Sequence, residues 1–146
     1  MKTRENTGTV VLVDGENVSA KRADEILRLA RRFGQVDLLR VYHRQKDPIT
    51  RAWTEKAKVS AYTDVCLFGG PEKNKIDRKI QKDAQRYFSA EHIGGVVVVS
   101  NDADFRCLAE DAAAAGKRFG VIGEKQAPAR LRRACDRFVE LPGHPV

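Results

Sequence analysis

The chain has 146 residues, of which 42% are apolar and 32% charged, a composition typical of one soluble globular domain. A formal net charge of +7 favours a polyanionic partner such as nucleic acid, or it reflects only the solubility that Lys and Arg provide. Cys66, Cys107 and Cys135 are widely separated and form no C-x-x-C pair, which argues against a disulfide framework or a zinc site and favours a reducing cytoplasm. The amino terminus, MKTRENTG, contains no apolar stretch, and no apolar run is long enough to span a bilayer, so we expect no membrane contact.

Along the chain, short β-branched runs alternate with stretches of helical period, which predicts an α/β fold with a parallel sheet. We expect strands over 9–13, 36–43, 64–68, 96–100 and 119–122, and a short edge strand over 138–141. We expect helices over 20–33, 49–60, 74–88, 103–115 and 128–136. The domain would cover 9–141, between a flexible arm at 1–8 and a tail at 142–146.

Two of these strands end in the same polar pattern. The strand over 9–13 is followed by DGEN, residues 14–17. The strand over 96–100 ends at Ser100 and is followed by NDAD, residues 101–104. In doubly wound sheets, ligands bind at the carboxyl ends of strands where the strand order reverses. If the two strands are neighbours, four side chains with oxygen ligands converge on one crevice, namely Asp14, Asn17, Asp102 and Asp104.

Carboxylates at this place favour a cation, whereas a nucleotide-binding domain would need a glycine-rich loop there. Clustered carboxylates repel one another unless they hold a metal or share protons, and hard oxygen ligands suit Mg²⁺ or Mn²⁺. A single aspartate between a strand and a helix is usually a helix cap. The repetition at two strands favours a metal site over capping, while Asn17 could ligate, orient a carboxylate, or only cap the first helix.

The segment KNKIDRKIQKDAQRYF, residues 73–88, predicts an amphipathic helix. Asp77 lies in its first turn, from which its carboxylate could reach the crevice, and we assign it to the metal site. Asp83 lies on the apolar side, where we expect a buried hydrogen-bonding role. The basic residues of the segment are Lys73, Lys75, Arg78, Lys79 and Lys82. They could contact the phosphates of an RNA backbone or simply form a solvated face.

These residues resemble the NYN domain family, in the LabA-like and limkain-like branch of the PIN-like nucleases. The matching pieces occur in the family's order over nearly the whole chain, as VDGEN, KNKIDRKIQKDA, SNDADF, GKRFGVIG and LRRACDRFVEL. The resemblance implies a PIN-like Rossmannoid domain whose parallel sheet has about five strands in the order 3-2-1-4-5, with helices on both faces. Two departures, Asn101 in place of a glycine and Lys75 before Ile76, leave every carboxylate in place.

By position, the resemblance implies catalytic roles for Asp14, Asn17, Asp77, Asp102 and Asp104. We expect a ribonuclease that hydrolyses RNA phosphodiester bonds with water activated on one or two Mg²⁺ or Mn²⁺ ions. Asp14 and Asp102 would be the central ligands, and Asp77 and Asp104 would complete or orient the shell. Asn17 would position a ligand or the scissile phosphate.

The substrate and partners follow from weaker signals. Few aromatic residues are available for base stacking, namely Tyr42, Trp53, Tyr62 and Tyr87. We therefore expect the substrate to be single-stranded RNA that is bound with loose sequence preference. Small PIN-like domains often act in pairs or complexes, so the resemblance also implies a homodimer or a complex with an RNA-targeting partner.

Two other functions stay open. The domain could be a non-catalytic module that binds RNA or a protein. It could also be a Toprim-like metal enzyme acting on DNA, although such enzymes need a glutamate after their first strand, where this chain has Asp14.

Overall fold

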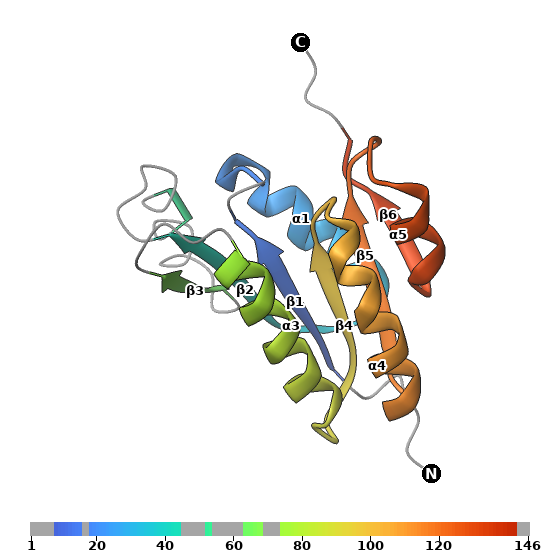
Figure 1. The fold of residues 1–146 in the computed structure, drawn as a ribbon. Coiled ribbons are helices and arrows are strands. Elements are labelled where there is room, and N and C mark those ends of the chain that lie inside the picture. The colour runs from blue at the N-terminus through green and yellow to red at the C-terminus, as the bar shows by residue number, and fades with distance from the viewer. Residues whose placement is uncertain (1–7, 16–17, 45–51, 54–62, 69–73, 143–146) are drawn as a thin grey trace.

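Within the part of the chain that the computed structural model describes, six strands form one fully parallel sheet in the order β3-β2-β1-β4-β5-β6 (Figure 1). The structure describes residues 8–15, 18–44, 52–53, 63–68 and 74–142. The strands are β1 (Gly8–Asp14), β2 (Val36–Arg44), β3 (Thr63–Phe68), β4 (Ile93–Val99), β5 (Arg118–Gly123) and β6 (Arg137–Glu140). The predicted order of the first five strands is confirmed, and the short strand expected near 138–141 is β6 at one edge.

Two central strands, β1 and β4, are buried along their whole length. This matches their unbroken apolar sequences, because strands covered on both faces need no polar alternation. The predicted start of β4 at Val96 is wrong, since the strand already begins at Ile93. Gly95 belongs to the sheet, where it pairs with Thr9 of β1 and Arg118 of β5.

The helical segments are η2 (Ala20–Arg22), α1 (Ala23–Ala30), η3 (Arg31–Phe33), α3 (Asn74–Phe88), η4 (Ala103–Cys107), α4 (Leu108–Ala115) and α5 (Ala129–Ala134). The helix predicted over 20–33 is therefore an α-helix with a 3₁₀ turn at each end, and it stops at Gly34, whose φ of 134° suits only glycine. The helix predicted over 103–115 likewise begins as the 3₁₀ segment η4. Of the helix predicted over 49–60, only Ala52 and Trp53 lie among the described residues, and both are helical.

Two apolar layers, one on each face of the sheet, hold the helices in place. Along β1, Val10 and Leu12 pack with Ile76 and Ile80 of α3. Val11 and Val13 pack on the opposite face, with Ile26 of α1 among their neighbours. Full burial of such a side chain contributes about 1.5–3 kcal/mol. By the same alternation, Asp14 at the end of β1 lies on the face that α3 covers.

No helix within the described ranges is long and apolar enough to cross a membrane.

Candidate metal centre

The candidate site lies where the strand order reverses. From β1 the chain builds outward through β2 and β3 on one side, and β4, β5 and β6 lie on the other. Val13 of β1 is opposite Val99 of β4, so the residues that follow these two strands emerge side by side at the carboxyl edge of the sheet. This is the position at which open α/β sheets bind their ligands.

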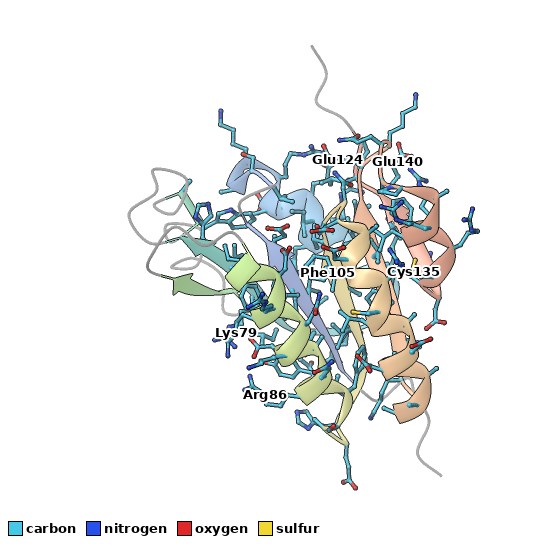
Figure 2. All side chains as sticks on the ribbon, viewed as in Figure 1. Lys79, Arg86, Phe105, Glu124, Cys135 and Glu140 are labelled. Carbon is cyan, nitrogen blue, oxygen red and sulfur yellow. The ribbon has the colours of Figure 1, made fainter. Side chains whose placement is uncertain are left out.

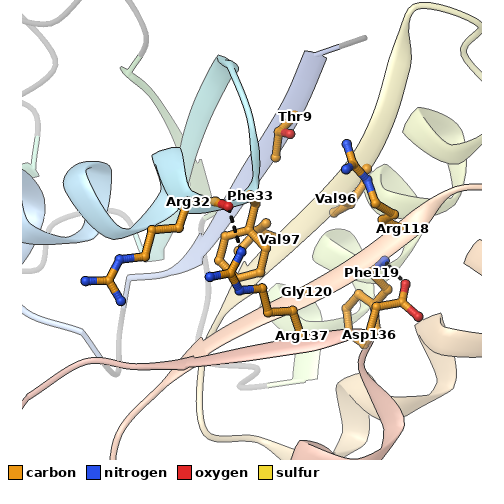
Figure 3. A pocket seen from close by; sticks show the side chains of 11 residues that line it. Thr9, Arg32, Phe33, Val96, Val97, Arg118, Phe119, Gly120, Asp136 and Arg137 are labelled. Carbon is orange, nitrogen blue, oxygen red and sulfur yellow. Dashed lines mark hydrogen bonds between the residues drawn. The ribbon is translucent and has the colours of Figure 1, made fainter. Parts of the chain in front are cut away.

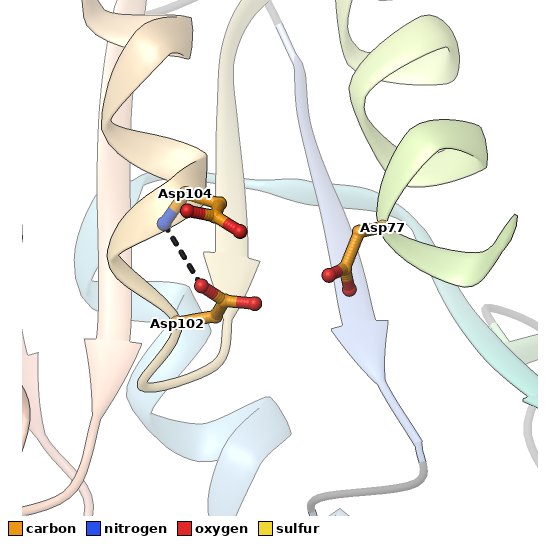
Figure 4. A group of neighbouring side chains, drawn as sticks. All are labelled: Asp77, Asp102 and Asp104. Carbon is orange, nitrogen blue, oxygen red and sulfur yellow. Dashed lines mark hydrogen bonds between the residues drawn. The ribbon is translucent and has the colours of Figure 1, made fainter. Parts of the chain in front are cut away.

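Three carboxylates from two segments meet at this edge. Each of Asp77, Asp102 and Asp104 offers an oxygen, and these oxygens lie within 4.8 Å of one another. Figure 4 shows Asp77 on α3 directed across β1 toward the other two, which follow β4. Oxygens on opposite sides of a Mg²⁺ or Ca²⁺ ion are roughly 4–5 Å apart, since each lies about 2.0–2.6 Å from the metal. The spacing and the hard oxygen donors therefore fit a divalent cation.

Local hydrogen bonds fix the loop after β4. The backbone N–H of Asp104 donates to Oδ1 of Asp102 over 2.9 Å, so Asp102 is the N-cap of η4. The capping role that the sequence left open is thus present, but it occupies one oxygen of the two. Asp102 is half-buried and Asp104 is exposed. The cap therefore orients Asp102 while its carboxylate still faces the site.

Ser100 connects the two strand ends. Its hydroxyl donates to Oδ2 of Asp14 over 3.2 Å and accepts from the backbone N–H of Asp102 over 3.0 Å. Asp14 is only 2% exposed, so its carboxylate depends on protein partners of this kind. Ser100 lies within the SNDADF motif, but no role was predicted for it from the sequence. A small hydroxyl residue between a valine strand and an aspartate was the available signal.

The carboxylates of the cluster repel one another when no cation is bound. Burial, followed by the negative charges of Asp102 and Asp14, raises the pKa of Asp77 from its usual 3.8 to about 7. A hydrogen bond with Asp102 and the charge of Asp104 act in the same direction. Carboxyl groups that share a proton in this way can exchange that proton for a metal ion.

The structure thus brings together Asp77, Asp102 and Asp104, with Asp14 beside them in electrostatic contact with Asp77. Asp14 is linked to the group through Ser100, and it is not one of the three residues whose oxygens lie within 4.8 Å. Asn17, the fifth predicted site residue, lies outside the described residues.

Asp83 has the buried hydrogen-bonding role expected for it. It is 1% exposed and accepts a 2.6 Å hydrogen bond from the hydroxyl of Tyr42, whose pKa is raised by burial and by this bond. Lys79 Nζ lies 3.1 Å and Arg86 Nη2 lies 3.3 Å from Oδ1 of Asp83, and Arg40 Nη1 lies 3.4 Å from Oδ2. Three cations around one carboxylate satisfy a buried charge that would otherwise be costly.

This network changes the predicted basic face of α3. Lys79 and Arg86, labelled in Figure 2, contact Asp83, while Arg78 and Lys82 are exposed. Lys73 and the side chain of Lys75 lie outside what the structure describes. Of the predicted RNA-contacting residues, Arg78 and Lys82 are therefore the described ones whose side chains are directed to solvent.

Two aromatic residues that the sequence offered for base stacking are not available. Tyr42 and Trp53 are both fully buried, Tyr42 against Asp83 and Trp53 within the layer beneath α1. Tyr87 is half-buried beneath the guanidinium of Arg86, and Tyr62 lies outside the described residues. Their burial reflects core packing, which short-range sequence patterns do not distinguish from surface stacking.

A second connection between strand ends, beside the metal centre, was also not predicted from the sequence. Asn101 Nδ2 donates to the carboxylate of Glu124 over 3.0 Å, and the backbone N–H of Glu124 donates to Oδ1 of Asn101 over 2.7 Å. These reciprocal bonds tie the loop after β4 to the end of β5. The asparagine at this position therefore has a structural reason, because its side chain links two neighbouring strand ends.

A parallel α/β sheet with an acidic cluster at its switch point is typical of Rossmannoid domains, and comparison with known proteins identifies the family. The chain matches the NYN domain over residues 8–142, and it belongs to this family. No curated protein matches the chain. Among solved structures, it is similar to Plasmodium falciparum nicotinic acid mononucleotide adenylyltransferase complexed with NaAD, with 8% identity, a TM-score of 0.42, and coverage of 96% of this chain and 77% of that one. A likeness of that size carries no argument about function.

Proposed function

We propose that this protein is a divalent-metal-dependent ribonuclease that hydrolyses phosphodiester bonds of single-stranded RNA. The observation that carries the proposal is the meeting of Asp77, Asp102 and Asp104 at the switch point of a NYN domain. Three carboxylates within 4.8 Å are electrostatically unfavourable alone, and a cation removes that cost.

The residues of the cluster divide into direct and supporting roles. Asp77, Asp102 and Asp104 would hold Mg²⁺ or Mn²⁺, and Asp14 would hold the same ion or orient its shell. A bound ion of this kind supplies Lewis-acid stabilisation of a phosphate and a more acidic water molecule. Ser100 holds Asp14 in place, and Asn17 would position a ligand or the scissile phosphate.

Charge outside the cluster favours a polyanionic substrate. The whole chain carries +7, even though the cluster concentrates negative charge at one place. Arg78 follows Asp77 directly and is exposed, and Lys82 lies on the same helix. Together with Lys73 and Lys75 they would contact the phosphates of a strand whose scissile bond lies at the acidic cluster. Lys79 would contribute less, because it is paired with Asp83.

The buried positions of Tyr42 and Trp53 leave little described aromatic surface for reading bases. Recognition would then depend on the backbone of the strand, with loose sequence preference. Free Cys107 and Cys135 suit a reducing cytoplasm, and burial raises the pKa of both thiols, which disfavours a thiolate nucleophile. A second copy of the chain or an RNA-targeting partner would supply further selectivity.

The test is cleavage of labelled single-stranded RNA, single-stranded DNA and duplex DNA by the full chain, with Mg²⁺, Mn²⁺ or EDTA. We expect RNA cuts only with metal, and their loss in Asp102→Asn. Asp37→Asn makes the same chemical change at the amino end of β2, where Asp37 is exposed, and should cut at the wild-type rate. RNA that binds but stays intact with either metal would overturn the nuclease and favour a binding module. Cuts in DNA alone would favour the Toprim-like alternative.

A further inference from the structure

A pocket lies at the opposite end of the sheet from the metal centre, on the face that α1 covers. Its volume is about 100 Å³, and it is lined by η3 and by residues of β1, β4 and β5 (Figure 3). The side chains that give it chemical character are Thr9, Phe33, Arg118, Asp136 and Arg137. Phe33 lies over Gly120, where a Cβ would come within 2.3 Å of the ring, so one wall of the pocket is apolar and fixed.

Thr9 places an unpartnered hydroxyl at this pocket. The residue is 1% exposed, and its Oγ1 has no hydrogen-bond partner among the described residues. Native proteins rarely leave such a group unsatisfied, because its desolvation costs about 1–3 kcal/mol. The strand is also irregular here: the register of β1 shifts between Thr9 and Val10 against β2, and between Gly8 and Thr9 against β4. Irregularities of this kind often re-aim a side chain beside a functional site.

Two arginine side chains, those of Arg118 and Arg137, line the same pocket (Figure 3). A Cβ built on Gly34 would lie 3.2 Å from Thr9 Oγ1 and 3.9 Å from Arg118 Nη2, so one glycine separates the hydroxyl from that guanidinium. Arg137 is anchored by donating to the carbonyl of Arg32 over 2.9 Å, and its guanidinium lies 5.6 Å from the ring centre of Phe33.

The charge of the pocket is positive. Among the described residues, neither Arg118 nor Arg137 forms an ion pair, while the Arg32 side chain is directed away from the pocket (Figure 3). Asp136 also lines the pocket and accepts from the backbone N–H of Phe119 over 2.9 Å, and its negative charge offsets one of the two arginines. Unpaired arginines around a buried hydroxyl are suited to an anion with several acceptor oxygens.

We propose that this pocket binds a phosphate group, with Arg118 and Arg137 contacting its oxygens and Thr9 donating the buried hydrogen bond. At about 100 Å³ it is well below the roughly 300 Å³ of the smallest common ligand pockets, so it holds the phosphate and leaves the rest of a nucleotide outside. The identity of the carrier rests on the proposed function, whose substrate and products carry phosphate. The carrier is then a free nucleotide or the phosphorylated end of an RNA strand.

The phosphate pocket is separate from the metal centre. Thr9 and Asp14 are five residues apart on one strand, which corresponds to roughly 17 Å. They also lie on opposite faces, since Thr9 lines the pocket with Phe33, which packs against the layer of Val11 and Val13. A phosphate bound here cannot be the one that is cleaved, so the pocket anchors or senses a second phosphate.

The experiment is an amide NMR titration of the full chain in EDTA at constant ionic strength, with inorganic phosphate, a nucleoside 5′-monophosphate, and a short RNA with a 5′-phosphate or a 5′-hydroxyl. We expect saturable shifts at Gly34 and Gly120 that weaken about tenfold in Arg118→Gln, the loss expected for one charge-assisted hydrogen bond. Arg133→Gln, an exposed residue of α5, is the matched control and should bind as wild type. Preference for the 5′-phosphorylated RNA identifies a strand end as the carrier, and equal binding of the monophosphate identifies a free nucleotide.

Thr9→Val separates binding from folding. Because the hydroxyl has no described partner, its replacement by an isosteric methyl should leave the melting temperature unchanged or raise it, while phosphate binding weakens severalfold. Shifts that never saturate, or that are the same in Arg118→Gln, Thr9→Val and Arg133→Gln, would overturn the pocket. EDTA prevents metal-dependent cleavage, so this result is independent of whether the protein is a nuclease. Asp102→Asn should bind phosphate normally even if it abolishes cleavage.

Discussion

The hydroxyl of Ser100 donates to Oδ2 of Asp14 over 3.2 Å, although the two residues are 86 positions apart in the chain. The same hydroxyl accepts from the backbone N–H of Asp102 over 3.0 Å. One buried side chain therefore fixes the carboxylate that ends β1 and the turn that carries Asp102 after β4. Ser100 therefore connects the two strand ends that the pairing of β1 and β4 brings side by side.

Ser100→Ala should weaken metal binding and RNA cleavage by about 10- to 100-fold, the usual effect of removing a group that orients a metal ligand. Asp14 would lose one of the hydrogen bonds that orient its buried carboxylate. The measurement is a metal-binding titration beside cleavage rates, with Ser89→Ala, an exposed serine after α3, as the control. Wild-type affinity in Ser100→Ala would show that Ser100 has no orienting role.

The raised pKa of Asp77 makes stability depend on pH when no metal is bound. Between its usual value of 3.8 and about 7, the folded protein holds a proton on Asp77 that the unfolded chain releases. Stability should therefore fall as pH rises through this range, because the folded state binds more protons. Urea unfolding in EDTA at pH 5 and pH 8 tests the sign. Asp77→Asn should remove this part of the pH dependence, and the same slope in wild type and variant would contradict the assignment.

Metal affinity should depend on pH in the opposite direction to the stability of the metal-free protein. A cation replaces the shared proton, so Mg²⁺ or Mn²⁺ affinity should increase with pH up to about 7 and then level off. Calorimetry in two buffers of different protonation enthalpy would detect proton release on binding near pH 6. Binding without proton release, at an affinity independent of pH, would place the cation away from Asp77.

Asp83 should matter for stability far more than for metal binding. Removing its carboxylate in Asp83→Ala leaves the Tyr42 hydroxyl buried without this partner and separates three ion pairs, which should cost about 3–5 kcal/mol. Tyr42→Phe removes only the hydroxyl and should cost about 1–2 kcal/mol. Urea unfolding of both single variants and the double variant gives the coupling energy. If Asp83→Asn keeps its stability but loses metal binding, Asp83 is a ligand and the present account of it is wrong.

The central architecture was predictable because its signals are local. Val10–Val13 and Val96–Val99 lack polar alternation, and this identified two strands buried on both faces. The helical period of residues 74–88 placed Asp77 in the first turn, from which it does reach Asp102 and Asp104. Carboxyl ends of neighbouring parallel strands must meet at one edge, so the acidic cluster followed from the order of the strands.

The remaining features depend on contacts between distant segments. In the sequence Ser100 is an ordinary polar residue. Its role follows from the structure, in which its hydroxyl lies 3.2 Å from Oδ2 of Asp14. Sequence indicated that Asp83 needed partners but not that Lys79 and Arg86 would turn toward it from the exposed face of α3. Thr9 at the start of a valine-rich strand gave no sign of a pocket, because Arg118 and Arg137 join it only through the sheet order.

The most direct test of the metal centre compares two curves for the same protein, namely Mn²⁺ binding by calorimetry and the rate of single-stranded RNA cleavage against Mn²⁺ concentration. We expect both to reach half-saturation at the same concentration, and we expect Asp102→Asn to weaken binding and abolish cleavage together while Asp37→Asn changes neither. Cleavage that persists in EDTA, or Mn²⁺ binding that Asp102→Asn leaves intact, would contradict the assignment of Asp77, Asp102 and Asp104 as the metal centre.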